Sequence, residues 1–305
     1  MQGLRTWQLF ALAVGVWGTT WHAILYQLPH NTPEVGVAIR FGLAGAVLLA
    51  LCAWRGERLR FDAGGHLRFA LQGLFLYSLS YVAVYHAERH VASGLVAVGY
   101  SASPLINAAG AWLLWRTPTG GLRFMLGGVL GIAGVVLIFW PEMHEVREGP
   151  GEGSGVALGA ALTAAAVLLS SVGNLVAHAN PARRLPLWPA MGYSMLYGAG
   201  VSAAIALASG HPVNLPSAPS WWLSLVYLSV AGSMLAFGSF LTLQQRLGPG
   251  PASTVGVMTP LLAIVVSTLF EGYLPSAITI AGLALAVLGN VLMLQLRPAA
   301  GRAAE

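Results

Sequence analysis

The chain alternates between long apolar stretches and short polar interruptions. Most apolar stretches are about twenty residues long, the length that a helix needs to cross the hydrocarbon core of a bilayer. Charged residues, prolines and glycines mark the interruptions. This pattern predicts ten transmembrane helices, at residues 6–28, 34–54, 67–87, 91–115, 121–140, 154–178, 187–209, 220–244, 251–271 and 275–296. Because the connections are short, we expect consecutive helices to be antiparallel neighbours.

The predicted fourth and ninth helices share a proline inside an otherwise helical run. Pro104 follows Ser103, and Pro260 follows Thr259, 156 residues further on. Proline removes a backbone donor and clashes with the preceding turn, so it bends or breaks a helix. The recurrence predicts paired bends that shape a cavity near mid-membrane, with Ser103 and Thr259 bonding carbonyls that the prolines leave free. The alternative is that these prolines are simply tolerated within the membrane.

The same offset aligns the two halves of the chain. The glycines that coincide, two of the pairs after a one-residue shift, are Gly94 with Gly250, Gly127 with Gly282 and Gly134 with Gly289. Each half holds five spans, an odd number, so the second copy enters the membrane from the opposite side. Such inverted-topology repeats are characteristic of secondary transporters.

We therefore expect an all-α integral membrane protein, with ten transmembrane helices arranged as two inverted five-helix repeats around a central cavity. The first repeat covers residues 1–145 and the second covers 154–296. Residues 146–153 form the outer linker, and residues 297–305 form a cytoplasmic tail.

Composition and charge agree with a membrane location. Hydrophobic residues make up 56% of the chain and charged residues only 8%, and the mean hydropathy is +0.71. A soluble chain carries about 25% charged residues. With the N-terminus in the cytoplasm, twelve of the fifteen arginines lie on the inner side, which satisfies the positive-inside rule and places both termini in the cytoplasm. No basic cluster interleaved with aromatic residues indicates nucleic-acid binding.

Several short motifs resemble a known family. They are Trp17-Gly18-Thr19, Arg40-Phe41, the proline helices followed by glycine-rich helices, and Glu271-Gly272. Together they are similar to the drug/metabolite transporter superfamily, in particular its ten-helix EamA-type exporters. The N-terminal stretch and the tyrosine-rich third span look most like the YddG aromatic amino acid exporters. The resemblance implies export of amino acids, aromatic ones above all, and of related metabolites by alternating access across a bacterial inner membrane.

Polar and aromatic side chains inside the spans are the candidates for handling a substrate, because such groups tend to face the bundle interior. The candidate substrate-binding residues are Trp17, Tyr77, Ser78, Tyr81, Tyr100, Ser103, Asn107 and Met258. Aromatic walls with a few hydroxyl and amide groups suit a ligand with one apolar and one polar end. The alternatives are interfacial belts for Tyr and Trp, helix–helix hydrogen bonds for Ser and Asn, and packing for Met258.

Hinge or gating roles are assigned to Pro104, Pro260 and Arg40. Arg40 lies about six residues into the second span, from where we expect its side chain to reach the outer interface. The alternative is that Arg40 attracts a substrate carboxylate. His22 is the one titratable group expected deep in a span. Without an ATP-binding domain in this chain, we expect facilitated transport, with proton antiport through His22 as the alternative.

Other classes of function fit less well. Cys52 is the only cysteine, which excludes disulfides and thiolate metal clusters. The pair His86 and His90 is spaced H-x-E-x-H at a predicted loop and is not expected to bind metal. We expect no cofactor and no enzymatic activity, since no catalytic constellation is evident. A carrier for a drug, a nucleotide precursor or a sugar phosphate stays open, and the internal inversion disfavours a channel. The expected partners are a small-molecule substrate and the lipid bilayer, with the chain a monomer.

Overall fold

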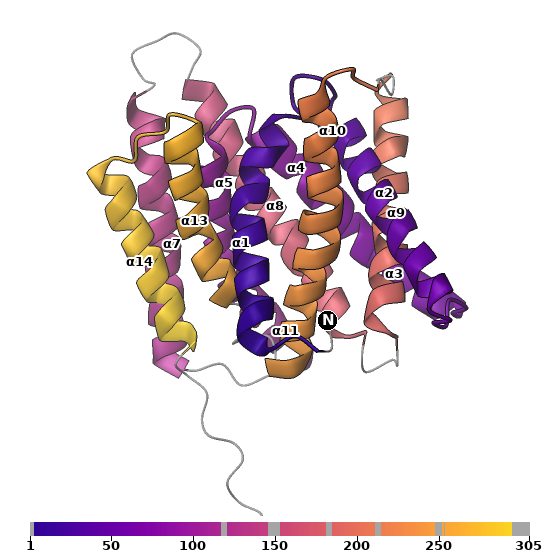
Figure 1. Ribbon diagram of the computed structural model, residues 1–305. Helices are drawn as coiled ribbons and strands as arrows, with labels where there is room; N and C mark the ends of the chain where they lie inside the picture. Colours follow the sequence, from indigo (N-terminus) through magenta and orange to yellow (C-terminus); the bar gives the residue numbers. More distant parts are fainter. Residues whose placement is uncertain are drawn as a thin grey trace, which may run out of the picture.

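The computed structural model describes residues 3–116, 121–145, 153–180, 185–210, 215–247, 252 and 254–294. Every regular element in this part of the chain is helical, and the elements form ten rods side by side (Figure 1). The all-helical prediction is confirmed, and the rods agree with the ten predicted spans to within a few residues. The predicted tail at 297–305, and all of the linker but Gly153, lie outside the described residues.

Seven rods are single helices, and three are composite. The single helices are α1 (Thr6–Leu25), α2 (Pro33–Trp54), α7 (Gly121–Glu145), α8 (Gly153–His178), α9 (Leu187–Ala208), α13 (Thr254–Phe270) and α14 (Ala277–Leu294). The third rod comprises α3 (Ala63–Gln72), the π-helix η1 (Gly73–Leu79) and α4 (Ser80–Ala87). The fourth comprises α5 (Ser93–Gly99), the 3₁₀ turn η2 (Tyr100–Ala102) and α6 (Ser103–Trp115). The eighth comprises α10 (Pro219–Val226), the π-helix η5 (Tyr227–Ala236) and α11 (Phe237–Leu247).

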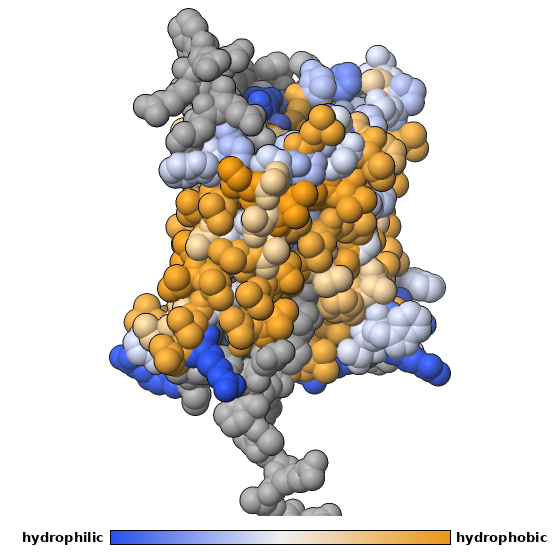
Figure 2. Space-filling view, turned by 90° about the vertical axis from the view of Figure 1, so that its left-hand side faces the viewer, coloured by the Kyte–Doolittle hydropathy of each residue, from blue (hydrophilic) through white to orange (hydrophobic). Residues whose placement is uncertain are grey.

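The outer surface of the bundle is apolar around its middle. Six of the rods are long and apolar enough to cross a bilayer, and three more contain shorter apolar helices. A broad hydrophobic band covers the middle of the molecule in Figure 2, and the polar side chains gather at its two ends. Large side chains such as Leu223 and Leu269 are more than two-thirds exposed, at 72% and 71%. Since water disfavours such a surface, the band is the face that the hydrocarbon of a membrane covers.

Glycines allow the closest helix contacts. The most extensive packing joins α7 to α14, and the next joins α2 to α9. A Cβ added at Gly134 of α7 would lie 2.5 Å from the backbone oxygen of Gly282 in α14, and one at Gly282 would lie 2.7 Å from the oxygen of Gly134. Only glycine permits this approach, which membrane helices use because dispersion contacts replace the hydrophobic effect there.

The two predicted proline bends differ in the structure. Pro104 is the second residue of α6, and α6 directly follows the 3₁₀ turn, so the fourth rod changes helix type two residues before Pro104. Helix α13 instead continues through Pro260 without a change of helix type, and the predicted bend there stays a prediction. Thr259 donates to the carbonyl of Val255 at 2.8 Å and adds a local contact at this turn. The Ser103 hydroxyl has no hydrogen-bond partner in the described residues, contrary to its predicted bond.

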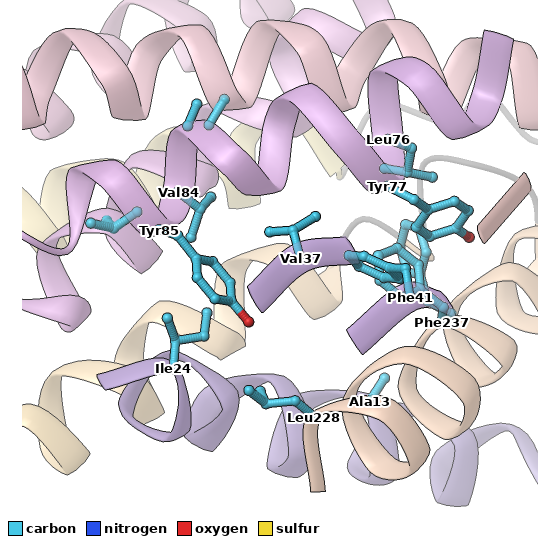
Figure 3. Close-up of a cluster of buried hydrophobic side chains, with 14 of the residues drawn as sticks. Ala13, Ile24, Val37, Phe41, Leu76, Tyr77, Val84, Tyr85, Leu228 and Phe237 are labelled. Carbon is cyan, nitrogen blue, oxygen red and sulfur yellow. The ribbon is translucent and has the colours of Figure 1, made fainter. Parts of the chain in front are cut away.

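Two π-helical segments were not predicted. They occupy the middle of the third and eighth rods, as η1 and η5. Apolar periodicity does not distinguish a π turn from an α turn, and such turns often mark functional sites. Close to them lies the buried core in Figure 3, where Tyr77 of η1 meets Phe41 of α2 and Phe237 of α11, with ring centroids 5.2 and 5.1 Å away.

Candidate functional site

A pocket lies inside the bundle between rods from both halves of the chain. It encloses about 880 Å³, including the space at its open mouth. Six aromatic side chains form much of its wall: Trp17, Trp21, Tyr81, Tyr100, Phe237 and Phe240. They come from α1, α4, η2 and α11, and residues of η1, α5, α6, α8 and α13 complete the lining. The pocket has the mixed apolar and polar lining typical of small-molecule sites.

The aromatic wall is held by contacts between distant segments. The ring of Trp17 packs edge-on against Phe237 at 4.9 Å, and Trp21 packs against Tyr100 at 5.2 Å. The indole nitrogen of Trp17 donates to the backbone oxygen of Gly232 in η5, at 3.2 Å. Trp17 and Trp21 are four residues apart on α1, so both face the same side of that helix. These contacts fix two indole rings without using any charged group.

Several polar groups of the lining lack a protein partner. The indole nitrogen of Trp21, the Ser103 hydroxyl and the amide oxygens of Asn107 and Asn174 are buried and make no hydrogen bond within the described residues. Burying such groups unpaired costs about 1–3 kcal/mol each. A site that gathers four of them is suited to a ligand or water that completes their bonds.

Five of the eight candidate binding residues come together at this pocket. They are Trp17, Tyr81, Tyr100, Ser103 and Asn107. The lining also contains residues outside the candidate set, among them Asn174, Phe237 and Phe240. Asn174 could have been identified from the sequence, because it is a polar residue in an apolar span. The two phenylalanines carried none, since they are indistinguishable in sequence from packing residues.

The structure corrects the placement of the other three candidates. Tyr77 is fully buried, and Phe41 and Phe237 pack against it and separate it from the pocket. Ser78 is also fully buried and bonds the hydroxyl of Ser202 in α9 at 2.8 Å, so it joins two helices. Met258 is 42% exposed and is not part of the pocket lining.

Arg40 lies at the back of the aromatic wall. Its side chain is 1% exposed, so it does not extend to an interface. The guanidinium donates to Ser233 of η5 at 3.1 Å and to the Tyr85 hydroxyl at 3.5 Å, and it lies 4.7 Å from the Tyr81 ring centroid. No carboxylate of the described residues forms a salt bridge with it. Arg40 therefore joins α2, α4 and η5 from behind the pocket.

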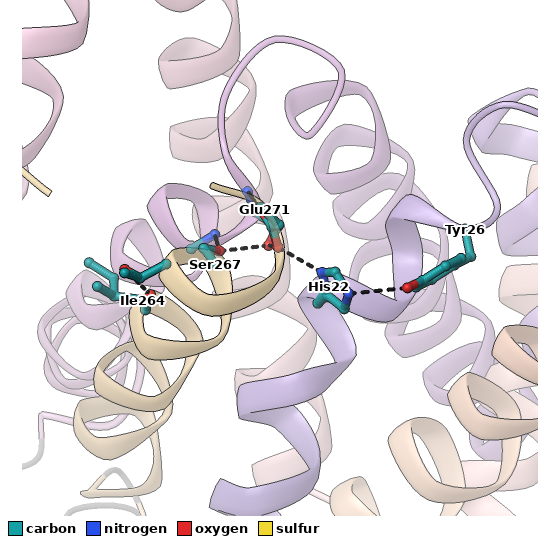
Figure 4. Close-up of polar contacts among 8 residues, drawn as sticks. His22, Tyr26, Ile264, Ser267 and Glu271 are labelled. Atoms are coloured by element: carbon teal, nitrogen blue, oxygen red, sulfur yellow. Dashed lines mark hydrogen bonds and ion pairs between the residues drawn. The ribbon is translucent and has the colours of Figure 1, made fainter. Parts of the chain in front are cut away.

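A second polar cluster lies at one end of the bundle, the end opposite to where α1 begins and α14 ends (Figure 1). There the carboxylate of Glu271 receives hydrogen bonds from the hydroxyl and the backbone nitrogen of Ser93, and it lies 3.0 Å from His22 Nδ1 (Figure 4). Ser267 accepts from the backbone nitrogen of Gly94 at 2.9 Å beside it. We call His22, Ser93, Ser267 and Glu271 the Glu271 cluster. It joins α1 and α5 to the end of α13.

Glu88 lies near this cluster, one residue beyond the end of α4. It is 6% exposed, and neither carboxylate oxygen has a hydrogen-bond partner in the described residues. Burial, together with the charge of Glu271, raises the pKa of Glu88 well above its usual range, and Arg40 opposes that rise. The sequence predicts that Glu88 lies in a loop and gives no sign that its side chain is buried. The structure reveals that burial.

This arrangement, a bundle of apolar rods around an internal polar and aromatic pocket, defines a multi-pass membrane protein with a small-molecule site. The comparisons identify the family. The profile of the EamA-like transporter family matches the chain twice, at residues 5–140 and 157–295. The chain belongs to the EamA-like transporter family, and it is a membrane transporter. The expected superfamily is thereby confirmed, and the family is one of transporters rather than enzymes.

Individual relatives extend over most of the chain. YedA of Escherichia coli K12, described as an uncharacterized inner membrane transporter, is 28% identical over 93% of this chain and 89% of its own length. Protein PagO of Salmonella typhimurium is 23% identical over 87% and 84%. An uncharacterized transporter of Archaeoglobus fulgidus is 23% identical over 96% and 100%. One solved crystal structure matches with a TM-score of 0.65 over 93% of this chain and 94% of that chain, at 21% identity, which shows the fold alone.

Proposed function

We propose that this transporter exports amino acids, chiefly aromatic ones, and related metabolites from the cytoplasm of a bacterium, by facilitated alternating access. The observation that carries the proposal is the pocket lined by six aromatic rings and by unpaired hydroxyl and amide groups. Such a lining matches a cargo with a flat apolar body and a polar end. The protein would act as a monomer in the inner membrane, with both termini in the cytoplasm.

Alternating access in this proposal rests on two inverted repeats, as predicted at residues 1–145 and 154–296. The family profile matches each half separately. The glycine contacts between α7 and α14 also support it. Gly134 contacts Gly282 while Gly289 contacts Gly127, and the alignment of the halves exchanges these two contacts. The π-helices η1 and η5 lie in corresponding rods, the third of each half.

The proposed state of this structure is the one closed to the outside. The Glu271 cluster joins α13 of the second half to α1 and α5 of the first (Figure 4). The bias of the arginines supports an outside location for that end. Pro104 and Pro260 would serve as bends in the opening movement, and Arg40 would hold η5 against α2 and α4.

Counterflow in proteoliposomes tests the proposal. Vesicles containing the purified protein and unlabelled phenylalanine or tryptophan should accumulate the labelled amino acid transiently and saturably. Trp17→Ala, which removes a ring from the pocket wall, should reduce counterflow at least tenfold. Met258→Ala, which alters a residue outside the pocket, should leave it unchanged. Absence of counterflow for every amino acid would overturn the cargo while leaving the family membership intact.

Proton-coupled antiport is the second candidate, and the contact between His22 and Glu271 favours it. A titratable pair at 3.0 Å joins the two halves at the closed end, where a proton would alter the contact. An imposed pH gradient that drives uphill uptake, abolished in His22→Gln, would establish this coupling. Counterflow that ignores the gradient would exclude it. If another metabolite or a drug replaces the amino acid in competition, the carrier has that cargo instead.

A further inference from the structure

The pocket contains aromatic faces and oxygen acceptors but no formal charge. None of the described residues that line it is acidic or basic. Each aromatic face carries the negative part of the ring quadrupole, which attracts cations and repels anions. The nearest buried positive charge that we identify, Arg40, lies behind the ring of Tyr81 and is not part of the lining. The pocket therefore offers an anion no charged partner.

Three of the unpaired buried atoms of the lining are oxygens that can accept a hydrogen bond. Ser103 and Asn107 lie one turn apart on α6, and Asn174 lies on α8, which packs against α6. The hydroxyl and the two amide oxygens of these residues have no partner in the described residues. The indole nitrogen of Trp21 is a further unpaired donor, and the Ser103 hydroxyl and the two amide groups can donate as well as accept. Three oxygens match the three N–H groups of a primary ammonium ion.

We propose that the wall formed by α6 and α8 binds the protonated amino group of the cargo, through Ser103, Asn107 and Asn174. The aromatic rings hold the apolar body, and a carboxylate is dispensable. The pocket then accepts primary aromatic amines as well as amino acids, and it rejects aromatic acids that lack an amino group. This inference rests on the proposed function, because it assigns the polar end of that cargo.

Arg40 decides where in the pocket the ammonium group lies. The guanidinium lies 4.7 Å from the Tyr81 ring, so its positive charge opposes a second cation on that ring. Asn107 and Asn174 are on other rods, where the nearest polar partners are the uncharged oxygens. The ammonium group thus belongs on the α6–α8 wall, and the aromatic body extends toward Trp17 and Phe237.

Three ligands that share a phenyl ring separate the two ends of the cargo: L-phenylalanine, phenethylamine and 3-phenylpropionate. Binding is measured first, as the ligand-dependent rise in the melting temperature of the detergent-solubilised protein. Phenethylamine should stabilise the protein at concentrations at least about tenfold lower than 3-phenylpropionate, as expected for a hydrogen bond to a charged group. Stabilisation by the acid at equal or lower concentration than the amine would overturn the inference, as would no stabilisation by the amine.

Variants locate the amine on the proposed wall. Asn107→Leu and Asn174→Leu should each weaken the phenethylamine effect about tenfold. Asn31→Leu is the matched control, because Asn31 also has an unpaired buried amide nitrogen but lies in the connection between α1 and α2. Asn107→Asp should retain or strengthen amine binding and weaken acid binding further, which a merely structural role for Asn107 does not produce. Equal loss for both ligands in every Asn107 variant would contradict the assignment.

Transport distinguishes this inference from the proposed function. If phenylalanine shows counterflow and phenethylamine neither binds nor competes, the amine site is wrong and the amino acid exporter stands. If phenethylamine binds through Asn107 and Asn174 but no amino acid shows counterflow, the amine site stands and the proposed amino acid cargo fails.

Discussion

If the Glu271 cluster holds one end of the bundle shut, as proposed, removing the carboxylate of Glu271 should release that end. Its oxygens accept two hydrogen bonds from Ser93 and lie 3.0 Å from His22, and the side chain is 10% exposed. A hydrogen bond to a charged group contributes about 1.5–3 kcal/mol, so losing the two bonds from Ser93 should cost about 3 kcal/mol or more. Because all these contacts join the two halves, the loss falls on the closed state. Each 1.4 kcal/mol changes an equilibrium about tenfold. Glu271→Ala should therefore shift the ratio of molecules open at this end to molecules closed at it on the order of 100-fold.

The assay is labelling of Ser103→Cys from outside intact cells by a membrane-impermeant maleimide. Cys52, which is 2% exposed, is first replaced by alanine so that the pocket carries the only thiol. Labelling of Ser103→Cys should be slow with Glu271 present and much faster with Glu271→Ala. The control is Glu34→Ala, because Glu34 bonds His86 at 2.7 Å within the first half and does not join the halves. A less than threefold change with Glu271→Ala, or an equal change with Glu34→Ala, would refute the reasoning.

Three further changes test the packing and the buried charges. Arg40→Lys should destabilise the protein by about 2–4 kcal/mol, because lysine cannot reproduce both the hydrogen bond and the stacking on Tyr81, and an unchanged melting temperature would contradict this. Gly134→Ala should cost about 1–3 kcal/mol through overpacking against α14, whereas Gly131→Ala, where an added Cβ meets nothing within 4 Å, should cost far less in the same thermal denaturation. Since burial raises the pKa of Glu88 above the usual 4.5, the folded state holds a proton that the unfolded state releases, so stability should fall as pH rises above about 4.5. Glu88→Gln should lose that dependence in melting curves between pH 5 and 8, and a parallel decline in both proteins would show that Glu88 is not its source.

The sequence predicts the rods because the membrane constrains them strongly. A span needs about twenty apolar residues, and no other local property has to be known. Helix α2 illustrates this, because the predicted span covers residues 34–54 and the observed helix covers Pro33–Trp54. The third rod begins at Ala63 rather than 67, because Asp62 caps it by accepting from the backbone nitrogen of Gly65 at 2.8 Å. The π-helices could not be predicted, since they depend on packing with other rods.

The pocket could be predicted only in part. A polar or aromatic residue inside a span is expected to avoid lipid, but the sequence does not show which residues it contacts. Tyr81 and Tyr77 are four residues apart, and both rings lie near Phe237, at 6.3 and 5.1 Å. Only Tyr81 lines the pocket, because the aromatic rings around Tyr77 cover it. The contact between His22 and Glu271 joins residues 249 positions apart, and no local pattern contains it.

The different conformations at the two prolines follow from alternating access if the halves are inverted copies. In any single state the copies must differ, and the opposite state exchanges their conformations. The first copy is interrupted at Tyr100–Ala102 beside Pro104, and the second is continuous through Pro260. Opening the Glu271 cluster with Glu271→Ala should therefore loosen the turn before Pro260 and tighten the one before Pro104. Hydrogen exchange should become faster at the amides of residues 255–259 and slower at residues 99–103. Faster exchange in both segments would show general loosening, and unchanged exchange in both would mean that the prolines do not take part in the transition.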